Sequence, residues 1–445
     1  RYYLGSSLRF TACSYLCGNA SGIWELVAFR FLQGIGGGAL LSTSQAILFE
    51  AFPLERRSFA AAMFGLGVFI GPTVGPTVGG WIIDHQSWPW IFYINLPIGL
   101  AAALLSFCFV TEPAKVRRAD VIDWGGIALL VAGLGALQVV LERGEREDWF
   151  QSGYIVALAA VAAAALVGFV VHELRTPHPV VDLRILRTRS LAVASLLTFV
   201  LGFALFATVF IVPVFTQSLL GFTALQTGLL FLPGAVVSVV ALPLIGRLLG
   251  RGVPPQLMAI SGFIVVGVFS WLLSRQDFET GSADFFWPII FRAIGLCLLI
   301  VPLTQLAVSG LAPADIPQGA ALNNMMRQLG GSFGVALINT YIVHRTAAHR
   351  LDLVSHLAAG DPATAARLRS GAALFRAAGA PPLEAAHRAF GLLEMAVARQ
   401  AALLSYLDTF MVVALFAFCC VPLVVLAGRP RSLSRGAALA AAESH

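Results

Sequence analysis

Twelve long runs of mostly apolar residues follow one another along the chain, and shorter polar segments separate them. A helix needs about 20 such residues to cross the hydrocarbon core of a bilayer. The pattern therefore predicts an all-α polytopic membrane protein. The predicted spans are residues 3–20, 26–48, 59–83, 90–110, 124–141, 153–172, 191–214, 225–246, 257–273, 286–308, 321–344 and 403–427.

Composition supports this class of protein. Hydrophobic residues make up 58% of the chain and charged residues 12%, whereas a soluble domain has about 25% charged residues. The net charge is +6, but Lys115 is the only lysine, which argues against nucleic-acid binding. The six cysteines lie in apolar runs without metal-ligand spacing, so we expect no metal site and no cofactor.

Basic residues indicate the orientation, because cytoplasmic loops of membrane proteins collect Lys and Arg. The distribution predicts that both ends of the chain are cytoplasmic, because the external short loops then hold only Arg143, Arg146 and Arg275. The cytoplasmic segments then hold Arg1, Arg56, Arg57, Lys115, Arg117, Arg118, Arg175, Arg184, Arg187, Arg189, Arg247, Arg251, Arg429, Arg431 and Arg435.

One external segment, residues 345–402, is long and rich in Ala and Arg, with a predicted turn at Gly379-Ala380-Pro381-Pro382. Composition favours a solvated helical hairpin. The alternative is a docking surface for a partner protein.

Among the arginines inside predicted spans, three stand out: Arg30, Arg292 and Arg327. Such residues usually face the interior of a helix bundle or a water-filled path, although each also lies close enough to a span end to reach the headgroups. Amides in the later spans either bond to neighbouring helices or line a cavity. The candidate polar cavity residues are Gln217, Gln305, Asn323, Asn324, Arg292 and Arg327.

No Asp or Glu lies in the middle of a predicted span. A proton-coupled carrier normally needs a carboxylate within the membrane, so either this residue lies on a preceding segment or the protein does not use protons. We favour a preceding segment, because the chain begins at Arg1 without a methionine and enters an apolar run at once.

The span 59–83 contains GPTVGPTVGG, in which two Gly-Pro pairs interrupt an apolar run. Gly67, Gly71, Gly75 and Gly79 recur every four residues and form one stripe on a helix. Small residues at this spacing allow two helices to approach closely. Pro72 and Pro76 each remove an amide donor and are expected to bend or stiffen the helix.

Several motifs together resemble the major facilitator superfamily of drug exporters. RFLQGIGGG (30–38) is similar to the motif of the fourth family span, with Arg30, Gln33, Gly34 and Gly36. WPWIFYINLPIG (88–99), Asp123 to Gly126, LERGEREDWF (141–150) and PVVDLRIL (179–186) resemble the fourteen-span EmrB/QacA branch, closest to EmrB. GVFIGPTVGPTVGG (67–80) resembles the antiporter motif, here Gly67, Gly71, Pro72, Gly75, Pro76, Gly79 and Gly80.

The resemblance implies a proton-driven exporter of lipophilic or amphipathic compounds in the bacterial inner membrane, working by alternating access. Arg30 would take part in proton coupling, and the helix 59–83 would form part of the contact between two bundles. It also implies that 12 of 14 spans are present and that the N-terminus is truncated. The implied domains are 1–110, the remaining N-terminal bundle; 111–190, two additional spans; 191–427, the C-terminal bundle with the loop 345–402; and 428–445, a cytoplasmic tail.

The implied partners are membrane lipid, small lipophilic substrates, protons, a periplasmic adaptor and an outer-membrane channel. Three alternatives remain: a dedicated exporter of one native compound such as a fatty acid or siderophore, an inert truncated fragment, and an integral membrane enzyme. The enzyme is disfavoured and no catalytic residue is expected, because the sequence has no HExxH or DxxxD motif and no His cluster within a span.

Overall fold

The computed structural model describes residues 2–53, 56–110, 123–177, 179–309, 311, 315–357 and 361–426. Within this part the regular structure is entirely helical. The helices are α1 (Tyr2–Gly18), α2 (Ile23–Ala51), α3 (Arg57–His85), α4 (Trp90–Tyr93), α5 (Asn95–Phe109), α6 (Trp124–Arg143), α7 (Gly153–Arg175), α8 (Arg189–Ser218), α9 (Ala224–Leu230), α10 (Leu232–Gly250), α11 (Pro255–Leu273), α12 (Phe286–Val308), α13 (Ile316–Ser355), α14 (Pro362–Ala377) and α15 (Pro382–Leu426). Short 3₁₀ turns are η2 (Glu145–Glu147), η3 (Trp149–Gln151), η4 (Leu183–Arg187) and η5 (Ser282–Phe285).

All twelve predicted spans fall on these helices, which confirms the all-α class. Two predicted spans are each divided into two helices: 90–110 into α4 and α5, and 225–246 into α9 and α10. In the described part of the chain, nine helical stretches are long and apolar enough to cross a membrane. The other three predicted spans are α1, which has 17 residues, α13, where polar residues lower the mean hydropathy, and α3, several of whose side chains lie outside the described residues.

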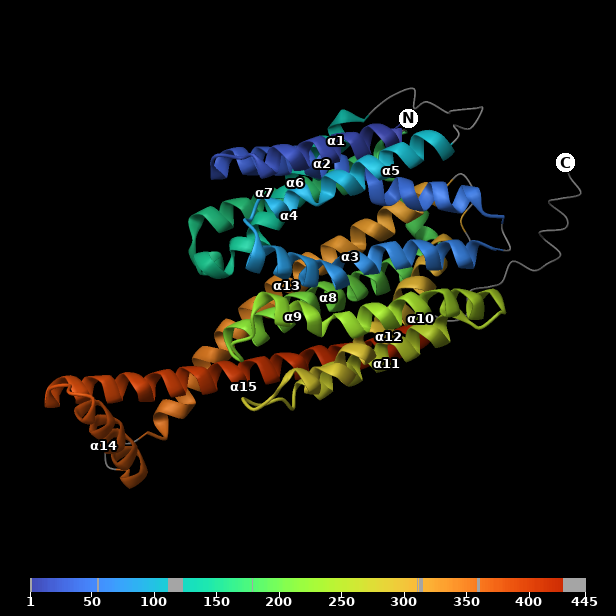
Figure 1. Cartoon of the computed structure of the whole chain (residues 1–445). Helices are drawn as coiled ribbons and strands as arrows, with labels where there is room; N and C mark the ends of the chain where they lie inside the picture. The colour runs from blue at the N-terminus through green and yellow to red at the C-terminus, as the bar shows by residue number, and fades with distance from the viewer. Residues whose placement is uncertain are drawn as a thin grey trace, which may run out of the picture.

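Apart from α14, the long helices run side by side along roughly one common direction (Figure 1). The largest buried apolar cluster lies among α8, α10, α11, α12 and α15. Two glycines bring α8 and α13 into backbone contact: a Cβ at Gly202 would overlap the carbonyl of Arg327, and one at Gly330 would overlap that of Phe199. This close packing fixes the face that α13 turns toward the other helices.

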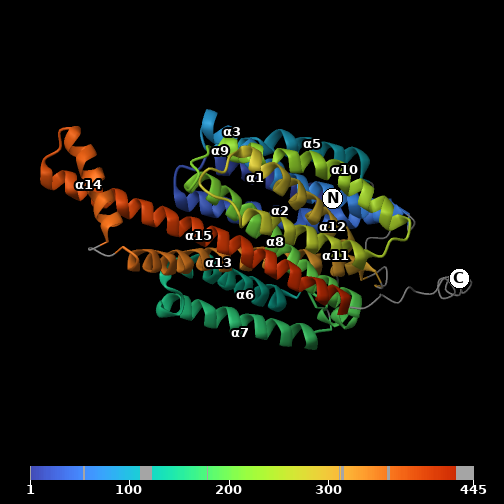
Figure 2. The ribbon, with the colours of Figure 1, turned by 90° about the horizontal axis from the view of Figure 1, so that it is seen from below.

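The helices α6 and α7 pack on each other and lie on one flank of the molecule beside α13 (Figure 2). Asp123 joins them, because its carboxylate accepts from the backbone N–H of Gly126 at 2.9 Å and contacts His172 Nε2 at 2.9 Å. The hydrogen bond from the Gly126 amide makes the largest contribution to lowering the pKa of Asp123, and the contact with His172 makes the next largest.

An arm projects from one end of the molecule. It consists of the last turns of α13, α14 and the first turns of α15 (Figure 1). The predicted hairpin is confirmed, and its turn lies at Gly379, which has φ +90°. Ion pairs tie α13 to α15 at its base: Arg350 contacts Glu394 at 2.6 Å, and Asp408 accepts from Arg345 and contacts His349 at 2.8 Å.

Candidate functional site

Arg30 lies on α2, one turn before Gln33, and the two side chains are bonded. The Arg30 NH1 donates to Gln33 Oε1 at 3.2 Å, and the guanidinium lies 5.2 Å from the centre of the Phe92 ring. Gln33 is 2% exposed, and its Oε1 also accepts from the Cys17 thiol of α1 at 3.7 Å. Neighbouring helices therefore hold the amide that orients Arg30.

Arg30 and Gln33 line a cavity of about 500 Å³ between α1, α2 and α13. Gly34, Gly37 and Gly38 contribute no side chain and so widen it on the α2 side. Gly36 has another role, because a Cβ there would lie 3.0 Å from the backbone nitrogen of Phe10. Of the predicted motif, Arg30, Gln33 and Gly34 thus line the cavity, and Gly36 packs against α1. The remaining lining residues are Phe10, Leu41, Ala321, Asn324, Met325 and Gln328.

A buried polar chain joins α2 to α13 next to this cavity. Asn324 Nδ2 donates to Gln45 Oε1 at 3.1 Å, and Arg327 NH2 donates to Asn324 Oδ1 at 2.9 Å. All three side chains are buried. Gln45 was not among the predicted site residues, although an amide late in an apolar helix was a signal for it.

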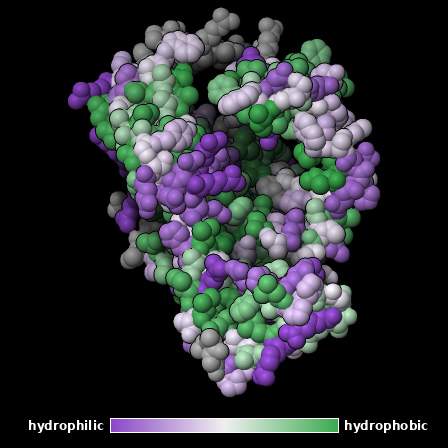
Figure 3. Space-filling view, turned by 90° about the vertical axis from the view of Figure 1, so that its left-hand side faces the viewer, coloured by the Kyte–Doolittle hydropathy of each residue, from purple (hydrophilic) through white to green (hydrophobic). Residues whose placement is uncertain are grey.

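The end of the molecule that carries α14 is hollowed at its centre, with apolar residues on the walls (Figure 3).

The second contact between the predicted bundles is made by α3, which packs on α9, α10 and α12. The Thr77 hydroxyl donates to the carbonyl of Gly228 at 2.5 Å, and Asp84 accepts from the Leu225 N–H at 3.2 Å. A Cβ at Gly80 would lie 2.5 Å from the Ala224 carbonyl oxygen. Helix α3, in the predicted domain 1–110, therefore contacts helices of the predicted domain 191–427.

The glycine stripe makes no close helix contact within the described part of the chain. Among the described residues, no atom lies within 4 Å of a Cβ placed on Gly67, Gly71, Gly75 or Gly79. Close packing is instead made by Gly80, about 100° further round the helix, because α3 turns that side toward α9. Pro76 lies in the unbroken helix α3, and the side chain of Pro72 lies outside the described residues. The bend stays a prediction.

The other candidate polar residues lie on three different helices, α8, α12 and α13. Arg292 of α12 is 1% exposed; its Nε donates to Thr208 of α8 at 3.0 Å, and its guanidinium lies 5.3 Å from the Phe231 ring. Asn323 and Arg327 are buried on α13, Gln305 lies on α12, and Gln217 is exposed on α8. Only Asn324 of this group lines the cavity that contains Arg30.

Sequence reasoning missed one buried carboxylate, Glu173, in the last turn of α7. Its Oε2 accepts from the Val181 N–H at 3.2 Å, and its Oε1 has no hydrogen-bond partner among the described residues. The described residues contain no group of three or more side chains placed to hold a metal ion.

Two sets of helices that meet around a cavity, with polar contacts that join them at separate places, define a membrane transporter. The model of the Major Facilitator Superfamily matches residues 1–335, and the chain belongs to this family. It is a multi-pass membrane protein.

The chain resembles named export and resistance proteins. It is 33% identical to the fatty acid resistance protein FarB of Neisseria gonorrhoeae, over 80% of this chain and 70% of that protein. It is 32% identical to the multidrug export protein EmrB of Escherichia coli K12, over 81% of this chain and 71% of that protein. A crystal structure of an auto-inhibited POT family peptide transporter matches with a TM-score of 0.56 and 16% identity, over 97% of this chain and 83% of that chain, which supports the fold alone.

Proposed function

We propose that this protein exports lipophilic or amphipathic compounds across the inner membrane in exchange for protons. The observation that carries the proposal is the cavity of about 500 Å³ between α2 and α13, which combines the intramembrane Arg30 with apolar and aromatic walls. Small-molecule sites commonly have such walls and a few polar groups. The similarity to EmrB supports the proposed export.

Arg30 is the proposed proton-coupling residue. Its partners among the described residues are the neutral amide of Gln33 and the Phe92 ring, and no carboxylate there forms an ion pair with it. Its charge is therefore available to a group that gains and loses a proton during transport. Protonation of such a group would weaken its attraction to Arg30.

Alternating access in this proposal uses the two contacts described above. Gln45 and Asn324 join the halves beside the cavity, and Thr77 and Gly80 join them at α9. Rocking of one half against the other would break one contact and preserve or form the other. In the proposed orientation both ends of the chain are cytoplasmic, and the domains are those that the motifs predict, 1–110, 111–190, 191–427 and 428–445.

A dedicated fatty acid exporter is the second candidate. Arg30 presents a cationic group at the edge of an apolar cavity, which suits the carboxylate of a long-chain acid. The similarity to FarB favours the same compound class.

Efflux from cells that lack their own exporters separates the two candidates. The multidrug proposal expects lower accumulation of several unrelated lipophilic compounds when the full-length protein is present. Protection against fatty acids alone would contradict it and favour the dedicated exporter. No effect on any compound would contradict both.

The arm is the proposed contact for a periplasmic adaptor, which would lead to an outer-membrane channel. It projects beyond the bundle and carries exposed apolar side chains at Leu374, Leu383 and Phe390. Site-specific crosslinking from Phe390 to a co-expressed adaptor tests this contact, with the exposed Leu229, outside the arm, as the control position. Equal crosslinking from both positions would contradict it.

A further inference from the structure

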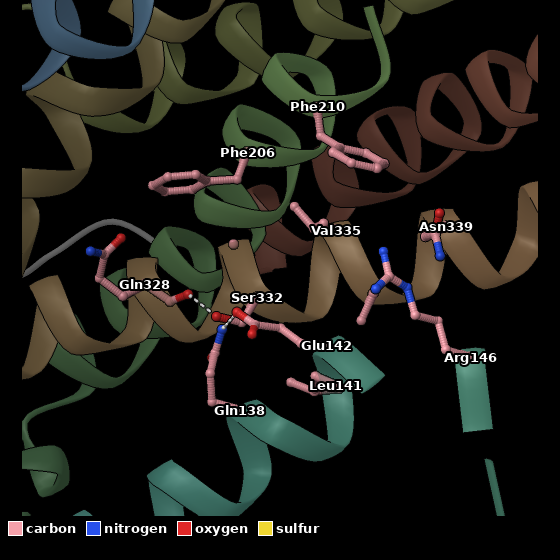
Figure 4. A pocket seen from close by; sticks show the side chains of 12 residues that line it. Gln138, Leu141, Glu142, Arg146, Phe206, Phe210, Gln328, Ser332, Val335 and Asn339 are labelled. Carbon is pink, nitrogen blue, oxygen red and sulfur yellow. Dashed lines mark hydrogen bonds between the residues drawn. The ribbon is translucent and has the colours of Figure 1, made fainter. Parts of the chain in front are cut away.

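A second cavity lies between α6, α8 and α13, away from Arg30, and its volume is about 620 Å³ (Figure 4). This is within the usual range for a small-molecule site, about 300–1,000 Å³. The lining combines two aromatic rings with an acid, a base and several amides. It consists of Gln138, Leu141, Glu142, Arg146, Phe206, Phe210, Gln328, Gly331, Ser332, Val335, Ala336 and Asn339.

The aromatic wall comes from α8. Phe206 and Phe210 lie one helical turn apart and both face the cavity. Gly331 of α13 is required for this arrangement, because a Cβ there would overlap the Phe206 ring. The wall offers flat apolar surface and the negative faces of two π-systems.

The acidic wall comes from the last turn of α6. Gln138 Nε2 donates to Glu142 Oε1 at 2.8 Å and orients the carboxylate, which points toward α13 (Figure 4). Among the described residues, Glu142 forms no ion pair. Arg146 follows four residues later, but it lies beyond Gly144 in η2, near Asn339, and does not pair with Glu142. One carboxylate oxygen therefore remains available to a ligand.

The two cavities meet at one residue, because Gln328 lines both. Their charged groups differ, since one contains Arg30 alone and the other contains Arg146 together with Glu142, which lies opposite aromatic rings. We propose that the α6–α8–α13 cavity binds lipophilic organic cations, with the positive charge at Glu142 and the apolar body against Phe206 and Phe210. This assignment rests on the proposed export function and adds a compound class to it.

The test measures binding of tetraphenylphosphonium to the purified full-length protein. Glu142→Gln keeps the size of the side chain and removes its charge, and we expect it to weaken binding about tenfold. Glu147→Gln is the matched control, because Glu147 is acidic and close by but does not line the cavity. We expect wild-type affinity for the control.

Phe210→Leu is a second variant that retains an apolar wall, and we expect about threefold weaker binding from loss of the ring. Unchanged binding by both Glu142→Gln and Phe210→Leu would overturn the proposal. A second result would also overturn the proposal: Arg146→Gln abolishes binding of laurate, and Glu142→Gln has no effect on binding of tetraphenylphosphonium. The site would then accept anions.

Export of an uncharged compound by the same variants separates this proposal from the general function. If Glu142→Gln exports the uncharged compound but loses the cation, the site assignment holds. If the wild-type protein exports nothing but binds tetraphenylphosphonium through Glu142, the export proposal fails and the site stands. If export is normal and Glu142→Gln binds the cation normally, the site assignment fails alone.

Discussion

The side-chain amide of Asn324 donates a hydrogen bond to Oε1 of Gln45 at 3.1 Å and so joins α13 to α2. Both side chains are buried, and Asn324 also accepts from Arg327. This is a direct polar contact between helices 279 positions apart in the sequence, next to the cavity that contains Arg30.

Removing either amide should destabilise the protein. Asn324→Ala and Gln45→Ala each leave a buried polar group without its partner, which costs about 1–3 kcal/mol. The Asn324 variant should be the less stable, because it also leaves Arg327 without its acceptor. Unfolding in detergent measures both, and Gln328→Ala, on an exposed position of the same helix, is the control. The double variant should lose less than the sum of the two single losses; strictly additive losses would mean that the bond contributes nothing.

Gly75 and Gly80 of α3 should respond differently to a larger side chain. Gly80→Leu places atoms on the Ala224 carbonyl and should cost about 1–3 kcal/mol through overpacking. Gly75→Leu points into open space and should leave the thermal midpoint unchanged. We still expect Gly75→Leu to stop turnover if the stripe packs against another helix at a different stage of transport. Normal transport by a stable Gly75→Leu variant would rule out that use of the stripe.

The buried Arg292 gives a test of function against stability. Thr208→Val removes the acceptor of its Nε and should destabilise the protein by about 1–3 kcal/mol. The separate variant Arg292→Met removes the buried charge itself. Its stability should be close to that of the wild-type protein, since apolar replacements of buried charges are often neutral. Stability and efflux are measured in parallel. Normal efflux by Arg292→Met would make Arg292 a packing residue and remove it from the transport site.

The arm should respond to acid through the N-cap of α14. Asp361 accepts from the backbone N–H of Thr364 at 2.9 Å and from its hydroxyl at 2.8 Å, and these bonds lower the pKa of Asp361. A lowered pKa means that the cap stabilises α14 at pH values above the ordinary aspartate pKa of about 3.9. The contribution is lost as the pH falls through the lower pKa of the folded state.

Hydrogen exchange of α14 measured against pH tests the cap. We expect protection to fall below pH 4 in the wild-type protein. Asp361→Asn keeps an acceptor but cannot titrate, so its protection should change less over the same range. An identical acid response in both proteins would assign the loss to other groups.

Hydropathy predicted the spans well, because a helix that crosses the bilayer core must be mostly apolar over about 20 residues. It did not predict that α13 and α15 run without a break from the predicted spans into the arm. Ala-rich turns favour a helix in water as well as in lipid, so a drop in hydropathy marks the end of the bilayer and not the end of the helix.

The candidate site was predicted in part. Arg30 and Gln33 were found because four glycines among residues 34–38 follow them in a recognisable motif. The sequence did not predict that Gly80 is the glycine of α3 that packs against a neighbour, because a small-residue pattern gives the possible faces and not the one that a neighbour occupies. Glu173 was missed because its burial depends on the loop residue Val181, which hydropathy cannot place.

The central claim is proton-coupled export that depends on Arg30, and transport by the full-length protein in proteoliposomes tests it most directly. An imposed pH gradient should drive accumulation of a lipophilic substrate against its concentration gradient and move protons in the opposite direction. Arg30→Ala should abolish both movements, while Arg143→Ala, at the exposed end of α6, should leave both intact. Substrate accumulation that persists without a pH gradient, or in Arg30→Ala, would contradict the account.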